Sequence, residues 1–317
     1  MMTDISKKKV TFIVPVYADW PAIEECVDSL KEHVGVSSRH SVIFINDCGP
    51  EVAMIEKNLK QAIKDTNYAY YRNKKNLGFV GVCNRGVLEI DKTNNDILLL
   101  NSDAKVTHGF LEEMLEVLYA SDRHGMVSPR SNNASINTVP LTAAGKGGID
   151  PQASFKLFER LKTKLPRYQE APVAHGFCML IRRSLITKYG LFDPVFGRGY
   201  GEEVDFCLRV RKHGFISVMC NRAFVFHLEA RSFTSETKAK LLEQNNKIIW
   251  SRYPTYRQSV RDYMERALER EAYAEVAAGG NAWLVVRARL KRRLKRNRRL
   301  YRLAVGIRGL LKDKRGR

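Results

Sequence analysis

The chain has 317 residues, of which 44% are hydrophobic, so it can bury a core and is not disordered throughout. Lys and Arg number 54 against 34 Asp and Glu, and the resulting charge of +20 predicts a surface that attracts phosphate groups. These groups could belong to a nucleic acid, to lipid headgroups or to a charged substrate, and charge alone does not choose among them.

Several features of the chain exclude a secreted or membrane-spanning main body. The six cysteines are scattered without a Cys-x-x-Cys pair, which argues against a zinc knuckle and against a disulfide-stapled domain. Pro15 interrupts the first apolar run, which is therefore typical of a strand and not of a secretion signal. Because no apolar stretch approaches the roughly 18 residues of a membrane span, we expect a cytoplasmic main body, soluble or peripheral.

Strand and helix patterns alternate over the first 120 residues. Continuously apolar runs predict strands at 10–16, 41–45, 68–71 and 96–100. Helical spacing of apolar residues predicts helices at 21–33, 51–62, 79–90 and 110–120. Apolar strands separated by helices predict an α/β fold with a mainly parallel central sheet and helices on both faces.

The regularity stops after Pro129. Residues 131–152 are rich in Asn, Ser, Thr and Gly, and we expect a long functional loop there. Order returns with a predicted strand, helix and strand at 174–183, 202–213 and 215–226.

The composition shifts again from about residue 250. Residues 256–280 are expected to be helical, and residues 281–317 form a basic tract. We therefore divide the chain into a main α/β domain, 1–255, and a helical, strongly basic C-terminal extension, 256–317.

Polar residues follow four of the predicted strands. In an open parallel sheet, ligands bind beyond the carboxyl ends of the strands. The residues found there are Pro15 and Tyr17, Asn46 and Asp47, Asn76 and Gly78, and Asn101, Ser102 and Asp103.

Seven segments carry a resemblance to a known family. In chain order they are VTFIVPVY, VIFINDCGP, NKKNLGFVGVCNRG, ILLLNSDAKV, AHGFCMLIRR, GLFDPVFGRGYGEEVDFCLRVRKHG and VFHLEARSF. Over residues 9–235 this order resembles the family 2 glycosyltransferases, in particular bacterial cell-surface polysaccharide and rhamnosyltransferase-like enzymes. The resemblance implies the GT-A (nucleotide-diphospho-sugar transferase) fold and transfer of a sugar from a nucleoside diphosphate to an acceptor hydroxyl.

The resemblance also implies a divalent metal, Mg²⁺ or Mn²⁺, held by Asp103. Hard cations prefer carboxylate and phosphate oxygens and can neutralise a diphosphate. The family has a D-x-D-like element here, but Asn101 occupies its first position and leaves one carboxylate. His227 would complete the metal shell, as in relatives with a similar V-x-H segment. Asp103 as a helix N-cap before Thr107 and His227 as a structural residue are the alternatives.

For the nucleotide, Asp47 resembles the acid that accepts the N3–H of a pyrimidine base, with Pro15 and Tyr17 around the base and ribose. This implies a UDP- or dTDP-sugar instead of a GDP-sugar. Asp47 as a turn residue before Gly49 is the alternative. We place Ser102 and Asp103 in the same nucleotide-sugar site.

The N-x-G-x5-N-x-G element adds Asn76, Gly78 and Asn84 to that site. Glycine lets the backbone approach a nucleotide closely. Asn76 would touch the ligand, whereas Asn84 would contact ribose or tie the loop to the helix.

The GYGEEVD segment is expected to supply the catalytic base of an inverting displacement. The family has Glu-Asp here with the second acid as base, so Glu203 takes that role. Glu202 and Asp205 belong to the same catalytic group and could instead face the metal, the acceptor or an Arg. An acidic helix start without a catalytic role is the alternative.

Residues 281–317 contain 15 Lys or Arg and one acid, interleaved with apolar residues. This pattern predicts an amphipathic helix on the anionic inner face of the plasma membrane, close to a glycan or lipid-linked acceptor. A solvated tail and an RNA-binding arm are the alternatives. A nucleic-acid-binding function would leave the strand-end motifs unexplained, and a degenerate transferase would account for Asn101.

Overall fold

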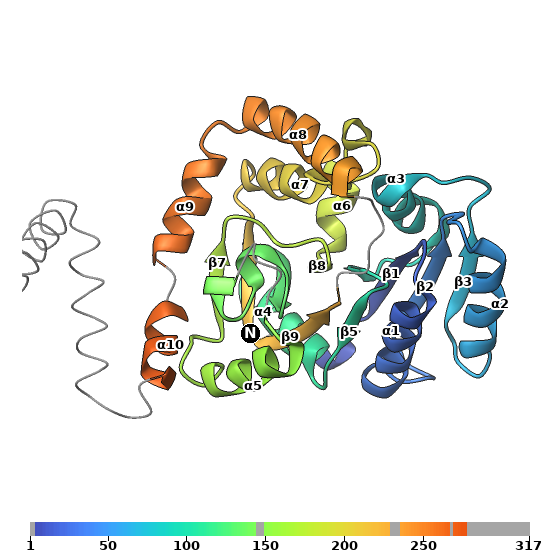
Figure 1. Cartoon of the computed structure of the whole chain (residues 1–317), viewed down its shortest axis with the longest axis horizontal. Helices are drawn as coiled ribbons and strands as arrows, with labels where there is room; N and C mark the ends of the chain where they lie inside the picture. Colours follow the sequence, from blue (N-terminus) through green and yellow to red (C-terminus); the bar gives the residue numbers. More distant parts are fainter. Residues whose placement is uncertain (1–3, 144–148, 229–234, 267–268, 278–317) are drawn as a thin grey trace, which may run out of the picture.

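The computed structural model describes residues 4–143, 149–228, 235–266 and 269–277 (Figure 1). The βα alternation predicted for the first half is confirmed. The elements there are η1 (Ile5–Lys7), β1 (Val10–Val16), α1 (Trp20–His33), β2 (Ser41–Asn46), α2 (Val52–Ala62), β3 (Ala69–Arg72), α3 (Gly78–Arg85), η2 (Gly86–Ile90), β4 (Asp96–Leu100), β5 (Ala104–Val106) and α4 (Phe110–Tyr119).

The second half contains more structure than its sequence pattern indicates. Its elements are β6 (His124–Arg130), η3 (Ser135–Asn137), η4 (Leu141–Ala143), α5 (Pro151–Leu161), β7 (Tyr168–Ala171), β8 (Cys178–Ile181), α6 (Arg183–Tyr189), η5 (Pro194–Phe196), α7 (Glu202–Arg211), β9 (Ile216–His227), α8 (Ser235–Arg252), α9 (Tyr256–Arg266) and α10 (Glu269–Ala277). The predictions lacked β5, β6, β7, α5, α6 and α8.

Nine strands of the described chain form one sheet, in the order β3-β2-β1-β4-β8-β6-β9-β5, with β7 paired to β9. The β1, β2, β3 and β4 pairs are parallel, as is β6 with β9, whereas β8 is antiparallel to both β4 and β6. Strands β5 and β7 are antiparallel to β9. The α/β class is confirmed, but the sheet is mixed because a strand buried on both faces is equally apolar in either direction.

Helices cover both faces of the sheet, as expected. Alternate residues of β1 point to opposite sides, so Phe12 joins the core cluster shared with α1, α2 and α4, whereas Ile13 joins the cluster shared with α3, α6 and α7. The six cysteines are free thiols, five of them buried, in agreement with the expectation from their spacing.

The predicted loop at 131–152 is largely folded into the protein. Asn137 is fully buried, and its side-chain amide donates to the Pro129 carbonyl at 2.7 Å and to the Ser128 hydroxyl at 3.0 Å. Ser131 is also fully buried. The polar composition therefore reflects an internal hydrogen-bond network, and α5 begins at Pro151 within the stretch expected to be irregular.

Helices α8 to α10 follow one another around the molecule (Figure 1). Tyr256 and Tyr263 of α9 pack against the core cluster that includes α7, and Ala272 of α10 packs with Phe158 of α5. The domain division at residue 255 stays a prediction, and the predicted basic helix at 281–317 lies outside the described residues. None of the helices described is both long and apolar enough to span a bilayer.

Candidate functional site

Asp47 lies just beyond β2, and backbone and side-chain donors hold its carboxylate. Oδ1 accepts from the Asn73 amide at 2.7 Å and from the Leu77 N–H at 2.8 Å, and Oδ2 accepts from the Gly78 N–H at 2.9 Å. Burial raises the pKa of Asp47, and these hydrogen bonds offset part of the increase. A carboxylate has about four acceptor positions, so one on Oδ2 is left for a ligand N–H.

Pro15 and Tyr17 lie beside Asp47 at the carboxyl ends of β1 and β2. The Asp47 N–H donates to the Val16 carbonyl at 2.7 Å. Gly49 lies directly against Tyr17, since a Cβ atom at Gly49 would be 1.7 Å from the Tyr17 carbonyl oxygen. Both Pro15 and Tyr17 stay partly exposed, so the structure brings the three predicted nucleotide residues to one accessible edge of the sheet.

The N-x-G element joins this edge to a second loop. The Asn76 side chain accepts from the Gly78 N–H at 3.1 Å. A Cβ atom at Gly78 would lie 2.7 Å from the Cα of Arg198, so the glycine permits contact between two loops. The Asn84 side chain donates to the Phe192 carbonyl at 2.8 Å and accepts from the Phe192 N–H at 3.0 Å. These two bonds give Asn84 a structural role.

Strand pairing brings Asp103 and His227 together. Short strand β5 pairs with the end of β9, Ala104 stands opposite His227, and the Leu228 N–H donates to the Asp103 carbonyl at 3.0 Å. The Asp103 Oδ1 atom consequently lies 3.4 Å from the His227 Nε2 atom. Ser102 is partly exposed beside them. Helix α4 is capped by Gly109, so Asp103 is not its N-cap.

The contacts of His227 determine its tautomer. Its Nδ1 atom lies 2.7 Å from the Asn133 carbonyl oxygen, which can only accept, so Nδ1 carries the proton. In the tautomer with the proton on Nδ1, the Nε2 lone pair faces Asp103 and the Asn101 amide, whose Nδ2 atom is 3.4 Å away. A ring N–H bound to a backbone carbonyl is the usual arrangement of a metal-ligating histidine.

The Asp103–His227 pair fits a divalent cation. Two ligands about 2.1 Å from an ion and at about a right angle are separated by about 3 Å, close to the observed spacing. Within the described ranges, no group of three or more His, Cys, Asp or Glu residues gathers in a way that could hold a metal. Water and diphosphate oxygens would have to supply the other ligands.

Glu202 and Glu203 begin α7, directly after Gly201. Their Oε2 atoms are buried and have no hydrogen-bond partner within the described structure. Burial raises the pKa of both carboxyls, and the charge of Glu203 raises that of Glu202 further. Buried carboxyl oxygens without a hydrogen bond are costly and are typical of acid–base sites.

The segment 175–177, whose individual residues had no predicted role, contacts both Glu203 and His227. Gly176 lies against Glu203, because a Cβ atom at Gly176 would be 3.7 Å from the Glu203 Cβ. The Phe177 ring stacks at a tilt on the His227 ring, with centroids 5.1 Å apart. Burial lowers the pKa of His175 to about 4, with a smaller contribution from the neighbouring His227 side chain, so His175 is neutral at pH 7. The AHGF sequence was the only signal of this position.

Asp205 has other partners. Its carboxylate accepts from Arg209 Nε at 3.2 Å, from Arg252 at 2.8 Å and from the Tyr253 hydroxyl at 3.0 Å. These bonds tie α7 to α8, which lie side by side in Figure 1. The geometry matches the alternative in which Asp205 faces an Arg.

The loop before Glu202 is held by Asn245, a residue without a predicted role. Tyr200 has a φ of 71°, a strained value for a non-glycine residue. The Asn245 Nδ2 atom lies 3.1, 2.8 and 2.9 Å from the carbonyl oxygens of Phe196, Gly199 and Tyr200. Helix α8 therefore fixes the loop that positions the two glutamates.

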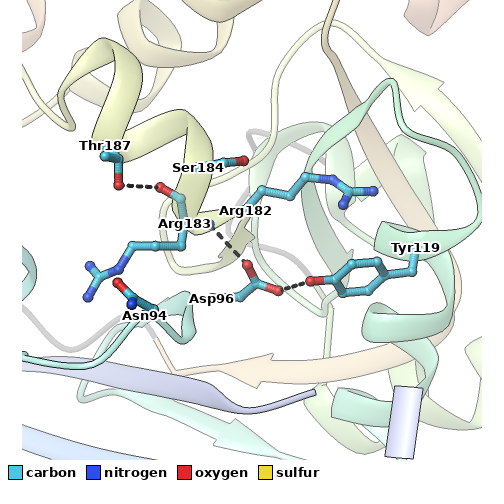
Figure 2. Close-up of a pocket in the computed structure, with 7 residues that line it drawn as sticks. All are labelled: Asn94, Asp96, Tyr119, Arg182, Arg183, Ser184 and Thr187. Atoms are coloured by element: carbon cyan, nitrogen blue, oxygen red, sulfur yellow. Dashed lines mark hydrogen bonds between the residues drawn. The ribbon is translucent and has the colours of Figure 1, made fainter. Parts of the chain in front are cut away.

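A separate hollow of about 450 Å³ opens at the amino end of β4, away from Asp103 (Figure 2). Asp96 accepts there from the Arg183 N–H at 3.0 Å and from the Tyr119 hydroxyl at 2.6 Å. Arg182 donates to the backbone carbonyls of Leu118, Ser121 and His124. These polar groups are hydrogen-bonded within the protein, so we interpret the hollow as structural and not as a ligand site.

Comparisons find known proteins that are similar to this chain in sequence and in fold. Residues 11–190 match the sequence model of Glycosyl transferase family 2. The low-salt glycan biosynthesis hexosyltransferase Agl10 of Haloferax volcanii is 23% identical over 241 residues, 74% of each chain. The N-acetylglucosaminyl-diphospho-decaprenol L-rhamnosyltransferase of Mycobacterium tuberculosis is 25% identical over 182 residues, 50% of this chain and 57% of the relative.

Two solved structures share the fold. The mannosyltransferase PcManGT from Pyrobaculum calidifontis, in complex with GDP-Man and Mn²⁺, has a TM-score of 0.56 and 17% identity, covering 95% of this chain and 86% of that one. GalNAc-T7, with UDP, GalNAc and Mn²⁺, has a TM-score of 0.56 and 14% identity, covering 86% and 53%. The predicted GT-A fold is thereby confirmed.

Proposed function

The chain belongs to glycosyl transferase family 2, and on that premise we propose that it transfers a sugar from a UDP- or dTDP-sugar to an acceptor hydroxyl with inversion at the anomeric carbon. The observation that carries the proposal is the spacing of 3.4 Å between Asp103 Oδ1 and His227 Nε2. Asp47 at the end of β2 and Glu203, whose buried Oε2 atom has no hydrogen-bond partner in the described structure, support it. Donor, metal and acceptor would meet along this edge.

Asp47 binds the base of the donor. Its remaining acceptor position on Oδ2 would take the imide N–H of uracil or thymine, while Pro15 and Tyr17 flank the base and ribose. Asn76 and Ser102 line the same edge.

Asp103 and His227 would hold Mg²⁺ or Mn²⁺ together with diphosphate oxygens and water. When bound, the ion would neutralise the negative charge that grows on the departing diphosphate. His227 enters this arrangement with its Nε2 lone pair already oriented by the Asn133 carbonyl.

Glu203 acts as the base. Its carboxylate removes the proton of the acceptor hydroxyl, and that oxygen attacks the anomeric carbon as the bond to the diphosphate oxygen breaks. The leaving nucleoside diphosphate takes the electron pair, and the proton stays on Glu203. Asp205 is less suited to this role because Arg209, Arg252 and Tyr253 already donate to its carboxylate.

A panel of UDP-, dTDP- and GDP-sugars, incubated with and without Mn²⁺, tests the function. We expect metal-dependent hydrolysis or transfer with a UDP- or dTDP-sugar and its loss in Asp103→Asn at unchanged fold. Turnover only with a GDP-sugar would overturn the donor assignment, and undiminished turnover in Asp103→Asn would overturn the metal site. Absence of turnover with every donor would favour a degenerate homologue, for which Asn101 is the motivating observation.

The acceptor is proposed to be a glycan or a lipid-linked saccharide at the inner face of the plasma membrane, in cell-surface polysaccharide synthesis. The name of the rhamnosyltransferase relative describes a diphospho-decaprenol substrate, and the basic tract at 281–317 would favour an anionic surface.

A further inference from the structure

A fully buried ion pair joins the C-terminal helices to the centre of the protein. Arg130, the last residue of β6, donates from Nη1 to the Glu269 Oε2 atom of α10 at 2.6 Å, and the two side chains are 1% and 2% exposed. Arg130 Nε also donates to Asn221 Oδ1 at 2.9 Å. The second oxygen of Glu269 accepts from the Leu141 N–H at 2.9 Å, so α10 holds both ends of the 130–141 segment.

The energetics of this pair do not explain it as a source of stability. Desolvating two charges costs several kcal/mol, and apolar residues of similar volume are often as stable as a buried pair. In addition, the Arg130 Nη2 atom is buried without a hydrogen-bond partner in the described structure. The pair instead fixes the position of α10 relative to β6, because the planar guanidinium of Arg130 links the end of β6 to one residue of α10.

The residues fixed in this way hold His227. The Asn132 side chain accepts from the His227 N–H at 2.8 Å and donates to the His227 carbonyl at 3.0 Å. The Asn133 carbonyl accepts from His227 Nδ1 at 2.7 Å. Two further bonds close the segment, from the Ser131 N–H to the Asn137 carbonyl and from the Val139 N–H to the Ser131 carbonyl.

We propose that Glu269 and Arg130 are positioning residues for His227: through the 131–133 segment they fix its ring orientation and tautomer, so that α10 sets the affinity of the Asp103–His227 pair for a divalent cation. This inference rests on the proposed function of that pair. Residues that orient a metal ligand typically change metal affinity by about 10- to 100-fold when replaced.

Mn²⁺ binding to the full chain in the presence of UDP, followed by electron paramagnetic resonance, tests the inference without turnover. The main variant is the double substitution Arg130→Met with Glu269→Leu, which removes both buried charges together and retains apolar volume. We expect a folded protein whose Kd for Mn²⁺ rises about tenfold or more. The control is Arg160→Ala, which removes a different α10 contact, to the Val276 carbonyl, and should leave Mn²⁺ binding unchanged.

Asp103→Asn serves as the reference. Weak Mn²⁺ binding by Asp103→Asn together with wild-type affinity in the folded double variant would overturn the positioning role and leave the proposed metal site standing. Wild-type affinity in Asp103→Asn would instead overturn the metal site. If the double variant does not fold, Glu269→Gln, which keeps the side-chain shape, is measured in its place, and wild-type affinity there would equally overturn the positioning role.

Discussion

Gly78 at the start of α3 touches the backbone of Arg198, a residue 120 positions further along the chain, so closely that an added Cβ atom would lie 2.7 Å from the Arg198 Cα. The contact joins the loop that Asp47 holds to the loop that precedes the two glutamates of α7. The donor half and the acceptor half of the proposed site are therefore linked through one glycine.

We predict that Gly78→Ala lowers the free energy of unfolding by about 2 kcal/mol or more, since backbone strain at positive φ adds to a clash with backbone atoms. Gly109→Ala is a matched control, because Gly109 has the same φ of 71° and no heavy atom within 4 Å of its added Cβ. Urea unfolding of both variants measures the difference. Equal losses would mean that the contact with Arg198 has no energetic importance.

Asp47→Asn should weaken UDP binding about tenfold or more, because an amide nitrogen on that side cannot accept the imide proton in a charge-assisted bond worth about 1.5 to 3 kcal/mol. CDP is the informative comparison, since its N3 atom accepts a hydrogen bond and should gain nothing from a carboxylate. Calorimetry with UDP, dTDP, CDP and GDP checks this. GDP binding as tight as UDP binding to the wild-type protein would remove the pyrimidine assignment.

Glu203→Gln and Asp205→Asn should separate catalysis from structure. Glu203→Gln keeps the shape of the side chain but not its basicity, so we expect a loss of turnover of roughly a hundredfold or more with UDP binding retained. Asp205→Asn leaves Arg209 and Arg252 with a neutral partner, so its main effect should be a loss of about 1 to 3 kcal/mol of stability. Kinetics and urea unfolding of both variants are required. The opposite pattern would exchange the roles of Glu203 and Asp205.

The sequence predicted the first half of the fold well, because β1, β2, β4 and their helices are local patterns with strong periodicity. The same patterns predicted that the site lies at the carboxyl ends of the strands, since Tyr17, Asp47 and Asp103 each come after a strand. Strand direction could not be predicted, because the apolar residues of β8 would pack equally well in a parallel or an antiparallel position.

Residues that hold the site in place, such as Asn245 and Glu269, could not be predicted from sequence patterns, for a different reason. Asn245 and Glu269 contact a loop and a strand end that lie at least 45 positions away in the sequence, through side-chain hydrogen bonds. Each is an ordinary polar residue in a helix, and only the folded arrangement gives it a partner. The approach of His227 to Asp103 depends similarly on the pairing of β9 with the three-residue strand β5.

The basic tract at 281–317 should bind anionic membranes. Each basic residue near such a surface could contribute about 1 kcal/mol, screened by salt, while the apolar residues among them add a salt-resistant part. Full-length protein should therefore sediment with vesicles that contain anionic lipid at low salt, less so at high salt, and not after removal of 281–317. Equal sedimentation of the truncated chain would assign the binding to another surface.

The stability gained by Glu202→Gln relative to the wild type should increase as the pH rises. Glu202 is 4% exposed, and burial together with the charge of Glu203 holds its pKa well above the ordinary value. A raised pKa in the folded state means that this carboxyl favours folding most below its unfolded pKa of about 4.3, and that this contribution is lost as the pH rises through the folded pKa. Gln has no proton to lose, so the stability difference between variant and wild type should grow from pH 5 to pH 8.

Glu243→Gln provides a control of opposite sign. Glu243 is exposed, and its hydrogen bond to Lys247 lowers its pKa, so its carboxylate stabilises the fold above the unfolded pKa and this contribution disappears as the pH falls. Urea midpoints at several pH values compare the two variants with the wild type. A Glu202→Gln difference that does not change between pH 5 and pH 8 would contradict the prediction, because it would mean that Glu202 does not change its ionisation in that range.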